Sequence, residues 1–460
     1  MTVSRQPQPT GNARRRHLTR PASAIAVMVL ALTTVAAVGG TDEVTGSPLP
    51  KAAVAGVAPE ATLRQLASAR GVRIGATIDD TTALNEPAYA ALFAREFDIG
   101  VSENAMKWGP IHPAPTTFNY EHGDAQVAFA GSHGSAFRGH NLAWHNQNPD
   151  WLLAGPFTRD ERIQQLQDHI REVVGHYKGR VAQWDVVNEA FDGLADPAHD
   201  PWSAEIGFPD YLDIAFRAAH EADPAARLFY NDYWLESPNS KFDKVIELVS
   251  GLRARGVPIH GVGFQTHQWS HPCTDVCANE VLGNMLRLQA MGLEVAITEM
   301  DVAIELPVTP EKLDEQASVY RSVLQACLLA PNCHTFVMWG FTDKYSWIPA
   351  TYHRYGAALP FDEQYRPKPA YAAILATLAN PPAAPSCASF VTQGEAQAAF
   401  KAPVLGAPLL DSDGNGRACE QLPANTPVPV PSPAPAPAPL ASPAPAPAPV
   451  PVLVSPNFTG

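Results

Sequence analysis

The chain has 460 residues and a formal net charge of −14, from 46 acidic and 32 basic residues. A chain this acidic is unsuited to neutralising phosphate backbones, so we expect no nucleic-acid partner. A neutral polymer would not be repelled by this charge. Because prolines and apolar residues are unevenly distributed, domain boundaries must be sought in local composition rather than in length.

The first 40 residues have the pattern of an export signal. A cluster of arginines between Arg14 and Arg20 precedes an apolar run from about Ala22 to Val38, and small residues follow it. This order is typical of a signal peptide at 1–40, so we expect a secreted protein, extracellular or associated with the cell wall. An uncleaved membrane anchor is the alternative, and both the general and the twin-arginine export routes stay open. We interpret 41–60 as a flexible N-terminal segment.

The six cysteines agree with an oxidising compartment and fall into three local groups. We interpret these groups as three disulfides, although six cysteines permit fifteen connectivities. A zinc site built on the first group is the alternative, but no second close pair of Cys or His completes it. The three groups are Cys273 with Cys277, Cys327 with Cys333, and Cys387 with Cys419.

From Arg73 to Asn380, short apolar runs alternate with longer segments of helical periodicity. Eight such repeats predict an α/β fold, a (β/α)8 TIM barrel that we place in residues 61–380. The clearest helix is expected from Thr158 to Tyr177, because its apolar residues share one face and Thr158 can cap it. The expected strands are 73–78, 99–104, 137–145, 181–189, 227–233, 259–267, 294–301 and 335–343.

Beyond the barrel the composition changes twice. Prolines at 381–386 predict a short stiff linker. A small disulfide-linked module is expected at 387–422. From 423 to 460, repeated Pro-Ala and Pro-Val units cannot bury a core, so we expect a disordered tail that serves as a spacer or a bacterial cell-wall tether.

Inside the module, a glycine-broken loop carries oxygen ligands at Asp411, Asp413, Asn415 and Glu420, as a calcium site requires. With its Asp-x-Asp and Ala-Cys-Glu signature, the module resembles the extracellular calcium-binding module called excalibur. Asn415 stands where that module has a third aspartate, which predicts weaker binding of Ca²⁺. A plain Asp/Gly/Asn turn is the alternative.

The C-terminal ends of the expected barrel strands are rich in polar and aromatic residues, and active sites of such barrels form there. This combination suits a sugar, whose hydroxyls need donors and acceptors and whose ring face stacks on indole. Glu189 and Glu299 close apolar strands four and seven, where a structural role would require a buried cationic partner. Paired glutamates suit double displacement at an anomeric carbon.

Six motifs make the barrel similar to glycoside hydrolase family 10, the family of endo-β-1,4-xylanases. They are ENAMKW at 103–108, GHNLAWH at 139–145, WDVVNEA at 184–190, GVGFQTH at 261–267, ITEMD at 297–301 and WGFTD at 339–343. The resemblance implies a retaining reaction without a catalytic cofactor, with Glu299 as nucleophile and Glu189 as general acid/base. It also implies that His267 and Asp301 hold Glu299 ionised.

By the same resemblance, the substrate is bound mainly by residues on the non-reducing side of the scissile bond, and Asn188 binds the 2-hydroxyl of the reacting sugar. The expected substrate-binding residues are Glu103, Asn104, Lys107, His140, Trp144, Asn188, Asn231, Gln265, Trp339 and Trp347. The expected activity is that of a secreted, monomeric endo-β-1,4-xylanase acting on plant cell-wall xylan. A β-1,4-glucan or a small aryl or saponin glycoside is the alternative substrate.

Three residues depart from the usual family pattern, namely His112, Asn141 and Asn148. We expect them beside the cleft, where they would affect the choice of glycan rather than the chemistry.

Two other functional classes must be weighed. A metal-dependent hydrolase could use His140, His145, His267 and Asp301 as ligands, but its first strand usually carries histidines and 73–78 has none. A non-catalytic glycan-binding protein would have no need for both glutamates together with Asn188.

Overall fold

The computed structural model describes residues 61–79, 83–193 and 196–424. The expected signal peptide, the segment 41–60 and residues 425–460 of the expected tail lie outside these ranges. Among the described helices, none combines the length and the apolar character needed to cross a membrane.

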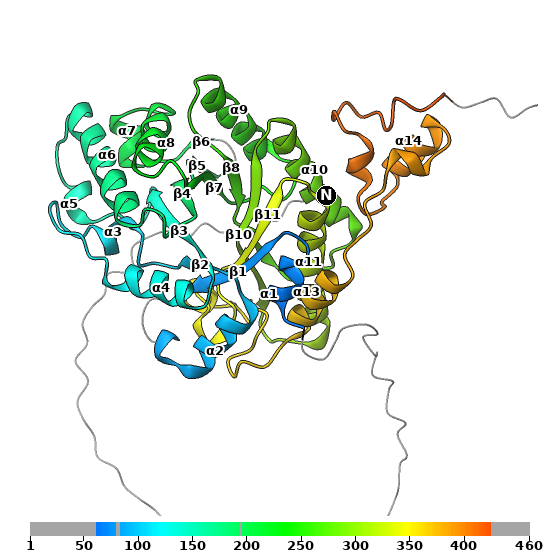
Figure 1. Cartoon of the computed structure of the whole chain (residues 1–460), viewed down its shortest axis with the longest axis horizontal. Helices are drawn as coiled ribbons and strands as arrows, with labels where there is room; N and C mark the ends of the chain where they lie inside the picture. The colour runs from blue at the N-terminus through cyan, green and yellow to red at the C-terminus, as the bar shows by residue number, and fades with distance from the viewer. Residues whose placement is uncertain (1–60, 80–82, 194–195, 425–460) are drawn as a thin grey trace, which may run out of the picture.

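Eight parallel strands form the closed barrel at the centre of Figure 1, which confirms the predicted fold. β11 pairs with both β10 and β1, and these two pairings close the sheet. In barrel order the strands are β1 (Arg73–Ile78), β2 (Ile99–Ser102), β3 (Ala136–Ala143), β4 (Gln183–Asn188), β7 (Arg227–Asp232), β8 (Gly261–Phe264), β10 (Glu294–Glu305) and β11 (Cys333–Met338).

The predicted ranges of most strands run too far at their C-terminal ends, because the polar residues there leave the ladder and form loops. β10 is the exception and continues past the predicted end at 301. Its outer half pairs with two short strands, β9 (His267–Trp269) and β12 (Tyr355–Gly356), that lie above the barrel ring.

A helix follows each barrel strand and lies outside the barrel (Figure 1). The predicted helix is confirmed as α6, and its N-terminus is a capping box in which Thr158 and Glu161 each bind the other's backbone N–H. The outer helices are α2 (Pro87–Glu96), α4 (Glu121–Ser132), α6 (Arg159–His176), α8 (Asp210–Ala222), α9 (Ser240–Ala254), α10 (Asp275–Ala290), α11 (Pro310–Leu329) and α13 (Pro369–Ala379).

α1 (Leu63–Ser68) precedes β1, and further short elements lie in the connections between the strands and the outer helices. The latter are η1 (Ala83–Asn85), α3 (Trp108–Ile111), α5 (Asp150–Leu153), β5 (Phe191–Asp192), β6 (Asp196–Pro197), α7 (Pro201–Glu205), η2 (Asp343–Tyr345) and α12 (Ile348–Thr351).

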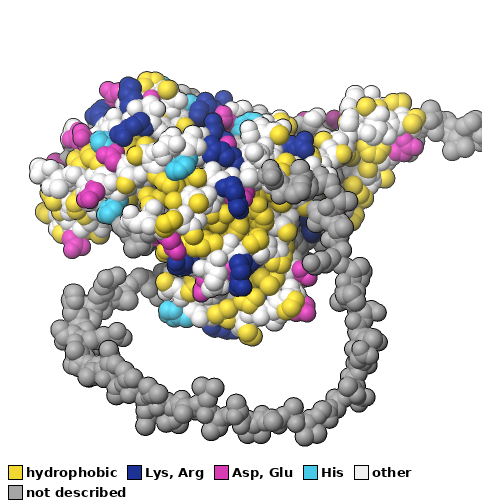
Figure 2. All heavy atoms as spheres, turned by 60° about the horizontal axis from the view of Figure 1, so that its bottom comes forward, with side chains coloured by type: hydrophobic (Ala, Val, Ile, Leu, Met, Phe, Trp, Pro, Cys, Tyr) yellow, Lys and Arg dark blue, Asp and Glu magenta, His cyan; other side chains and the backbone are white. Residues whose placement is uncertain are grey.

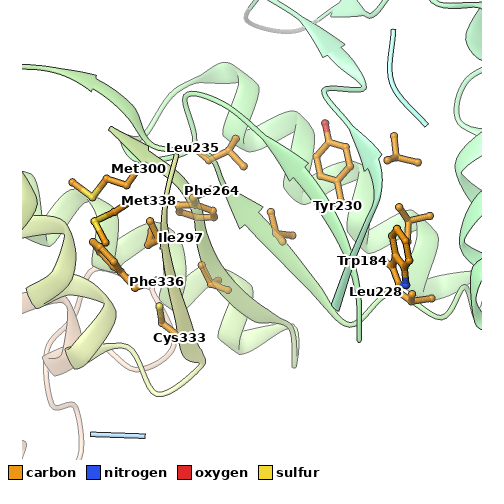
Figure 3. Packing of buried hydrophobic residues seen from close by; sticks show 14 of the residues in the cluster. Trp184, Leu228, Tyr230, Leu235, Phe264, Ile297, Met300, Cys333, Phe336 and Met338 are labelled. Atoms are coloured by element: carbon orange, nitrogen blue, oxygen red, sulfur yellow. The ribbon is translucent and has the colours of Figure 1, made fainter. Parts of the chain in front are cut away.

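A continuous apolar core fills the barrel and the space between its strands and helices. Figure 3 shows part of it, with Trp184, Leu228 and Tyr230 on neighbouring strands β4 and β7, and Ile297 and Phe336 on β10 and β11. This packing fixes the strand ends, and the site described below stands on them.

A small lobe follows the barrel and projects beside it in Figures 1 and 2. Residues 381–386 form no helix or strand, and the lobe itself contains η3 (Cys387–Ser389), α14 (Gln393–Lys401) and η4 (Ala407–Leu410). Asn279 of α10 ties the lobe to the barrel, since its Nδ2 donates to Val404 O at 2.7 Å and its Oδ1 accepts from Gly406 N at 2.8 Å.

The three predicted disulfides are confirmed, and no described cysteine is free. Cys273 and Cys277 are bonded to each other at the start of α10. Their sulfur atoms are therefore unavailable as the thiolates that a zinc site would need.

Candidate active site

The C-terminal ends of the barrel strands surround a cleft of about 550 Å³. Of the predicted catalytic and sugar-binding residues, all but Asn231 line this cleft. Those that do are Glu103, Asn104, Lys107, His140, Trp144, Asn188, Glu189, Gln265, His267, Glu299, Asp301, Trp339 and Trp347.

Glu189 stands at the turn that ends β4. Its φ of 54° is in the left-handed region, which is uncommon for a residue other than glycine and turns the chain sharply out of the strand. Trp144 Nε1 donates to Glu189 Oε2 at 2.8 Å, and Gln265 Nε2 donates to Oε1 at 2.8 Å. Asn188 Nδ2 also donates to Oε1 at 3.3 Å, so the carboxyl group is held at the wall of the cleft by donors on both oxygens.

Glu299 lies inside β10 at a break in the sheet. The register between β10 and β11 shifts between Ile297 and Met300, so the intervening residues form a bulge. Such a bulge redirects a side chain, and here Glu299 lines the cleft although its strand continues on both sides. Asn231 Nδ2 donates to Glu299 Oε1 at 2.7 Å.

Asn231 lies beneath the cleft and links Glu299 to Asn188, the neighbour of Glu189. Besides Glu299, its Nδ2 donates to Asn188 Oδ1 at 2.8 Å, and its own Oδ1 accepts from Thr298 Oγ1 at 2.7 Å. Gly263 leaves the space for it, because a Cβ there would lie 2.2 Å from Asn231 Oδ1. Asn231 is fully buried and outside the cleft lining, so the predicted sugar contact is wrong and its role is to position Glu299 and Asn188.

His267 lies between two carboxylates. Its Nε2 is 3.2 Å from Glu299 Oε2 and its Nδ1 is 3.0 Å from Asp301 Oδ2, while Trp347 Nε1 donates to the same Asp301 oxygen at 2.8 Å. Burial lowers the pKa of His267, but the charges and hydrogen bonds of Asp301 and Glu299 outweigh it and raise the pKa to about 10. The ring is therefore an imidazolium that donates to both carboxylates at neutral pH.

Glu299 stays ionised despite its burial. Burial raises the pKa of its carboxyl group, but His140 and His267 outweigh burial and leave the pKa below its ordinary value. His140 is itself held by Asp185, whose Oδ2 lies 3.0 Å from His140 Nδ1 and which forms a buried ion pair with Arg138. A desolvated, ionised carboxylate has the properties of a nucleophile.

The residues that follow β2 form one end of the cleft. Lys107 Nζ donates to Asn104 Oδ1 at 3.0 Å and lies 5.2 Å and 5.8 Å from the ring centroids of Trp144 and Trp339. A charged donor and an amide between two indoles offer both the hydrogen bonds and the flat apolar walls that a sugar needs.

Two glutamates in unlike surroundings, one ionised beside an imidazolium and one held by neutral donors, are the arrangement of a glycosidase. Comparison with known proteins agrees, because the sequence profile described as glycosyl hydrolase family 10 matches residues 62–377. The chain belongs to glycosyl hydrolase family 10.

Relatives in this family share most of the barrel with the chain. Endo-1,4-beta-xylanase B of Thermotoga neapolitana is 42% identical over 287 residues, which cover 62% of this chain and 82% of that protein. Endo-1,4-beta-xylanase C of Phanerodontia chrysosporium is 38% identical over 323 residues, 69% of this chain and 79% of that protein. The crystal structure of xylanase 10B from Thermotoga petrophila in complex with xylobiose has a TM-score of 0.67 at 38% identity and covers 70% of this chain and 98% of its own.

The three departures from the family pattern lie outside the cleft lining, contrary to the expectation that they border the substrate. His112 is buried with its Nδ1 3.1 Å from His169 Nδ1. Asn141 Nδ2 lies 3.2 Å from His140 Nε2, and Asn148 donates to Trp144 O at 2.9 Å. Asn141 and Asn148 can act on a sugar only through His140 and Trp144, the family residues that they support.

Several cleft residues were missed because they come from loops and from short or extended elements above the barrel ring, whose course the sequence does not reveal. They are Asn146, Gln147, Asp192, Trp234, Gln268, Trp269, Ala303, Ile348, Thr351 and Tyr352. One of them carried a usable signal: Trp269 stands two residues after His267, and alternate residues of an extended strand share a face.

The metal-hydrolase alternative requires four side chains to converge, and they do not. Within the described residues, the group of His, Cys, Asp or Glu side chains close enough to share one ion is His271, Cys273 and Cys277. Both nitrogens of His267 instead face carboxylates that hold it as an imidazolium, which has no lone pair for a metal.

The four predicted calcium ligands lie in an exposed loop of the lobe, where the Asn415 amide binds two of the three carboxylates. Asn415 Nδ2 donates to Asp413 Oδ2 at 2.8 Å and to Glu420 Oε2 at 3.0 Å, while Asp411 Oδ2 accepts from Gly416 N at 2.8 Å. The three carboxylates are not among the described groups whose ligand atoms all lie close enough to share one ion.

Proposed function

We propose that the chain is a secreted retaining endo-β-1,4-xylanase that hydrolyses internal β-1,4-xylosidic bonds of plant cell-wall xylan. The observation that carries the proposal is the ionised Glu299 beside the His267 imidazolium, with Glu189 lining the same cleft. The naming of its family relatives as endo-1,4-beta-xylanases, and the xylobiose in one related structure, support xylan as the substrate.

In the first step, Glu299 attacks the anomeric carbon while Glu189 gives its proton to the departing glycosidic oxygen. Glu299 loses its negative charge as the ester bond forms, and His267 then remains paired with Asp301 alone. Asn188 Nδ2 donates to Glu189 Oε1 at 3.3 Å, and we assign to Asn188 the binding of the 2-hydroxyl of the reacting sugar. In the second step, Glu189 takes a proton from water, whose oxygen attacks the anomeric carbon from the vacated side. The ester bond to Glu299 breaks, Glu299 leaves as a carboxylate, and the original configuration is restored.

The direct test is hydrolysis of xylan by the purified chain and by its Glu299→Ala variant. We expect reducing ends to appear rapidly along the polymer, with xylo-oligosaccharides of several lengths as early products and a loss of at least about 10⁴-fold in the variant. Parallel assays with cellulose, aryl β-cellobioside and aryl β-xyloside separate xylan from the alternative substrates. Faster turnover of any of these than of xylan, or undiminished activity of the variant, would overturn the proposal.

The proposal of secretion rests on the basic and apolar segments of residues 1–40 and agrees with the three disulfides. Expression of the full chain in a secreting host, followed by N-terminal sequencing of the protein in the medium, should show cleavage near residue 40. Retention of the intact N-terminus in the membrane fraction would favour the anchor instead. Size-exclusion chromatography of the mature protein should give the volume of a monomer.

For the C-terminal lobe we propose a weak calcium site and a role in holding the enzyme near a bacterial cell wall. The donor set supports calcium, because Asp411, Asp413 and Glu420 supply hard carboxylate oxygens and Asn415 can turn its amide oxygen inward. The calcium site is tested by calorimetric titration with Ca²⁺ of the full chain and of the double variant that carries Asp411→Asn and Asp413→Asn. Equal heats of binding from the two proteins would refute the site. The cell-wall tether is tested separately, by co-sedimentation of the full chain with isolated cell walls.

A further inference from the structure

The connection between β1 and α2 carries a carboxylate that the proposed mechanism does not use. Glu86 directly precedes α2, and its side chain is 28% exposed. Its two oxygens accept from Lys344 Nζ at 2.7 and 2.8 Å. Oε2 also accepts from the hydroxyl groups of Tyr345 at 2.6 Å and Tyr365 at 2.7 Å. Three donors that lie 258 to 279 residues further along the chain thus converge on one carboxylate.

Glu86 stays ionised far into the acid range. Hydrogen bonds from Lys344, Tyr345 and Tyr365 lower the pKa of its carboxyl group to about 2. Hydrogen bonds to an ionised acceptor are stronger than those to a neutral one. A single partly exposed ion pair adds little to the stability of a fold, but a carboxylate shared by three donors restricts where each of them can lie. The cluster therefore fixes the connection that follows β11 against the start of α2.

Two of the three donors lie next to a residue of the cleft wall. Lys344 and Tyr345 belong to η2, and Trp347 follows Tyr345 by two residues. Trp347 lines the cleft, and its Nε1 donates to Asp301 Oδ2 at 2.8 Å. A shift of η2 would move this indole with it, because one residue alone separates the two. Glu86 is thus connected to the cleft through η2, although it has no place in the cleft lining.

The two ends of η2 are held from different sides. Its first residue, Asp343, accepts through Oδ2 from Lys368 Nζ at 2.9 Å, which fixes where the connection leaves β11. Its last residue, Tyr345, is held by α2 and the residue before it. The Tyr345 ring meets Tyr89 of α2 edge to face at a centroid distance of 5.6 Å, and its hydroxyl donates to Glu86. The course of the chain from η2 into the cleft wall therefore depends on the start of α2.

The connection after β1 acts on the cleft from outside. Within the part of the chain that the structure describes, no residue between β1 and α2 lines the cleft. The next connection, after β2, differs, since it supplies Glu103, Asn104 and Lys107 to the lining. Any contribution of the first connection to substrate binding must therefore pass through a neighbouring segment, and the contacts of Glu86 with η2 provide that path.

We propose that Glu86 is a positioning residue for Trp347, which it holds in place through Lys344 and Tyr345. The assignment rests on the proposed glycosidase function, in which Trp347 is an aromatic wall for the bound sugar. It adds to that function a residue that touches neither the substrate nor the reacting atoms. Stacking of a sugar on an indole depends on close contact, and a gap of about 0.5–1 Å already forfeits a quarter to a half of the dispersion attraction.

The test is a double-mutant cycle in the full chain with xylohexaose as substrate. Glu86→Ala removes all the acceptors, whereas Glu86→Gln keeps the shape and one acceptor oxygen but loses the charge. Trp347→Leu removes the indole through which Glu86 is proposed to act and keeps apolar bulk. Asp213→Ala is the matched control. Asp213 of α8 is 22% exposed, accepts from Arg255 at 2.9 and 2.7 Å, and lies outside the cleft lining.

For Glu86→Ala we expect kcat/KM to fall roughly 10- to 10²-fold, as for a misplacement of about 1 Å, mainly through a higher KM. Glu86→Gln should fall between wild type and Glu86→Ala, and Asp213→Ala should leave kcat/KM unchanged. In the Trp347→Leu background, Glu86→Ala should cost less than about twofold, because the two changes remove the same interaction.

Equal fold-losses from Glu86→Ala in the two backgrounds would show a structural role that is independent of Trp347, and would overturn the proposal. Unchanged kcat/KM of Glu86→Ala in the wild-type background would overturn it as well. A wild-type chain that does not hydrolyse xylohexaose would instead refute the xylanase function itself, and the positioning role with it.

Discussion

His267 Nε2 lies 3.2 Å from Glu299 Oε2, and this contact joins a cation to the nucleophile. The imidazole owes its proton to Asp301 on its other side, which together with Glu299 raises the pKa of His267 to about 10 against the effect of burial. The same proton helps to hold the pKa of Glu299 below its ordinary value. Ionisation of the nucleophile and protonation of its partner are thus one coupled state.

Replacing His267 with Gln should separate the effect of its positive charge on Glu299 from the effect of its hydrogen bond. The amide still donates to Glu299, but it cannot supply a positive charge, so the pKa of Glu299 should rise and the acid limb of kcat/KM should move to higher pH. We expect kcat at the optimum to fall by roughly 10²-fold, as for the loss of one positioned electrostatic group. The measurement is kcat/KM for aryl β-xylobioside between pH 3 and 10, and an acid limb at the wild-type pH would contradict the coupling.

We also expect the effect of His267→Gln on unfolding free energy to change with pH. The folded-state pKa of His267, about 10, lies above the unfolded value of about 6.5, so its stabilising contribution is complete below pH 6.5. The contribution is lost progressively as the pH rises from 6.5 through 10. The difference in unfolding free energy between wild type and His267→Gln should therefore shrink over this range, as measured by guanidinium unfolding at each pH. A difference independent of pH would show that the ring is neutral in the folded protein.

Glu189→Ala tests the role of the acid through the leaving group. Xylan requires a proton on the departing oxygen, so we expect a loss of about 10²- to 10⁴-fold in kcat/KM. A dinitrophenyl β-xylobioside, whose phenolate departs without a proton, should form the glycosyl-enzyme intermediate at a much less diminished rate in a burst experiment. Gln265→Ala, which removes one donor to Glu189, is a milder comparison. Equal losses on the two substrates would contradict general acid catalysis by Glu189.

The barrel could be predicted from the sequence because hydrophobic periodicity and strand spacing are local properties. The start of each strand could therefore be recognised without knowledge of its tertiary contacts. It also predicted which residues meet in the cleft, since a parallel barrel brings every strand's C-terminal end to one face. Asn231 shows the limit: its position at a strand end suggested contact with substrate, but the missing side chain of Gly263 lets it turn beneath Glu299.

The remaining misses have a similar physical origin. His112 was expected beside the cleft from its place in the chain, yet stacking with Phe118 and contact with His169 draw it into the packing between loop and helix α6. Trp269 was missed although its spacing from His267 was a usable signal, because β9 is defined by its pairing with the distant and unusually long β10.

A buried lysine supports the acid/base side of the cleft from beneath. Lys241 of α9 is fully buried, and its Nζ lies 2.6 Å from Asp232 Oδ1 and 3.1 Å from the ring centroid of Tyr233, a cleft residue. Burial raises the pKa of Asp232 to about 6 although Lys241 and Tyr230 oppose the rise. Lys241→Met would leave this carboxylate without its cation, and we expect a loss of about 3–5 kcal/mol in unfolding free energy at pH 7.5.

The loss of unfolding free energy in Lys241→Met should depend on pH, because it arises from the charge on Asp232. Without Lys241 the folded-state pKa of Asp232 rises further above its unfolded value, so the folded protein binds its proton more tightly and stability is lost as the pH rises from about 4 through that pKa. The deficit relative to wild type should therefore be smaller at pH 5 than at pH 7.5 in urea unfolding. The double variant Asp232→Asn with Lys241→Met, which removes the buried charge as well, should recover most of the loss, because an amide has no charge to desolvate. A double variant no more stable than Lys241→Met would show that packing around Tyr233, and not the uncompensated carboxylate, causes the loss.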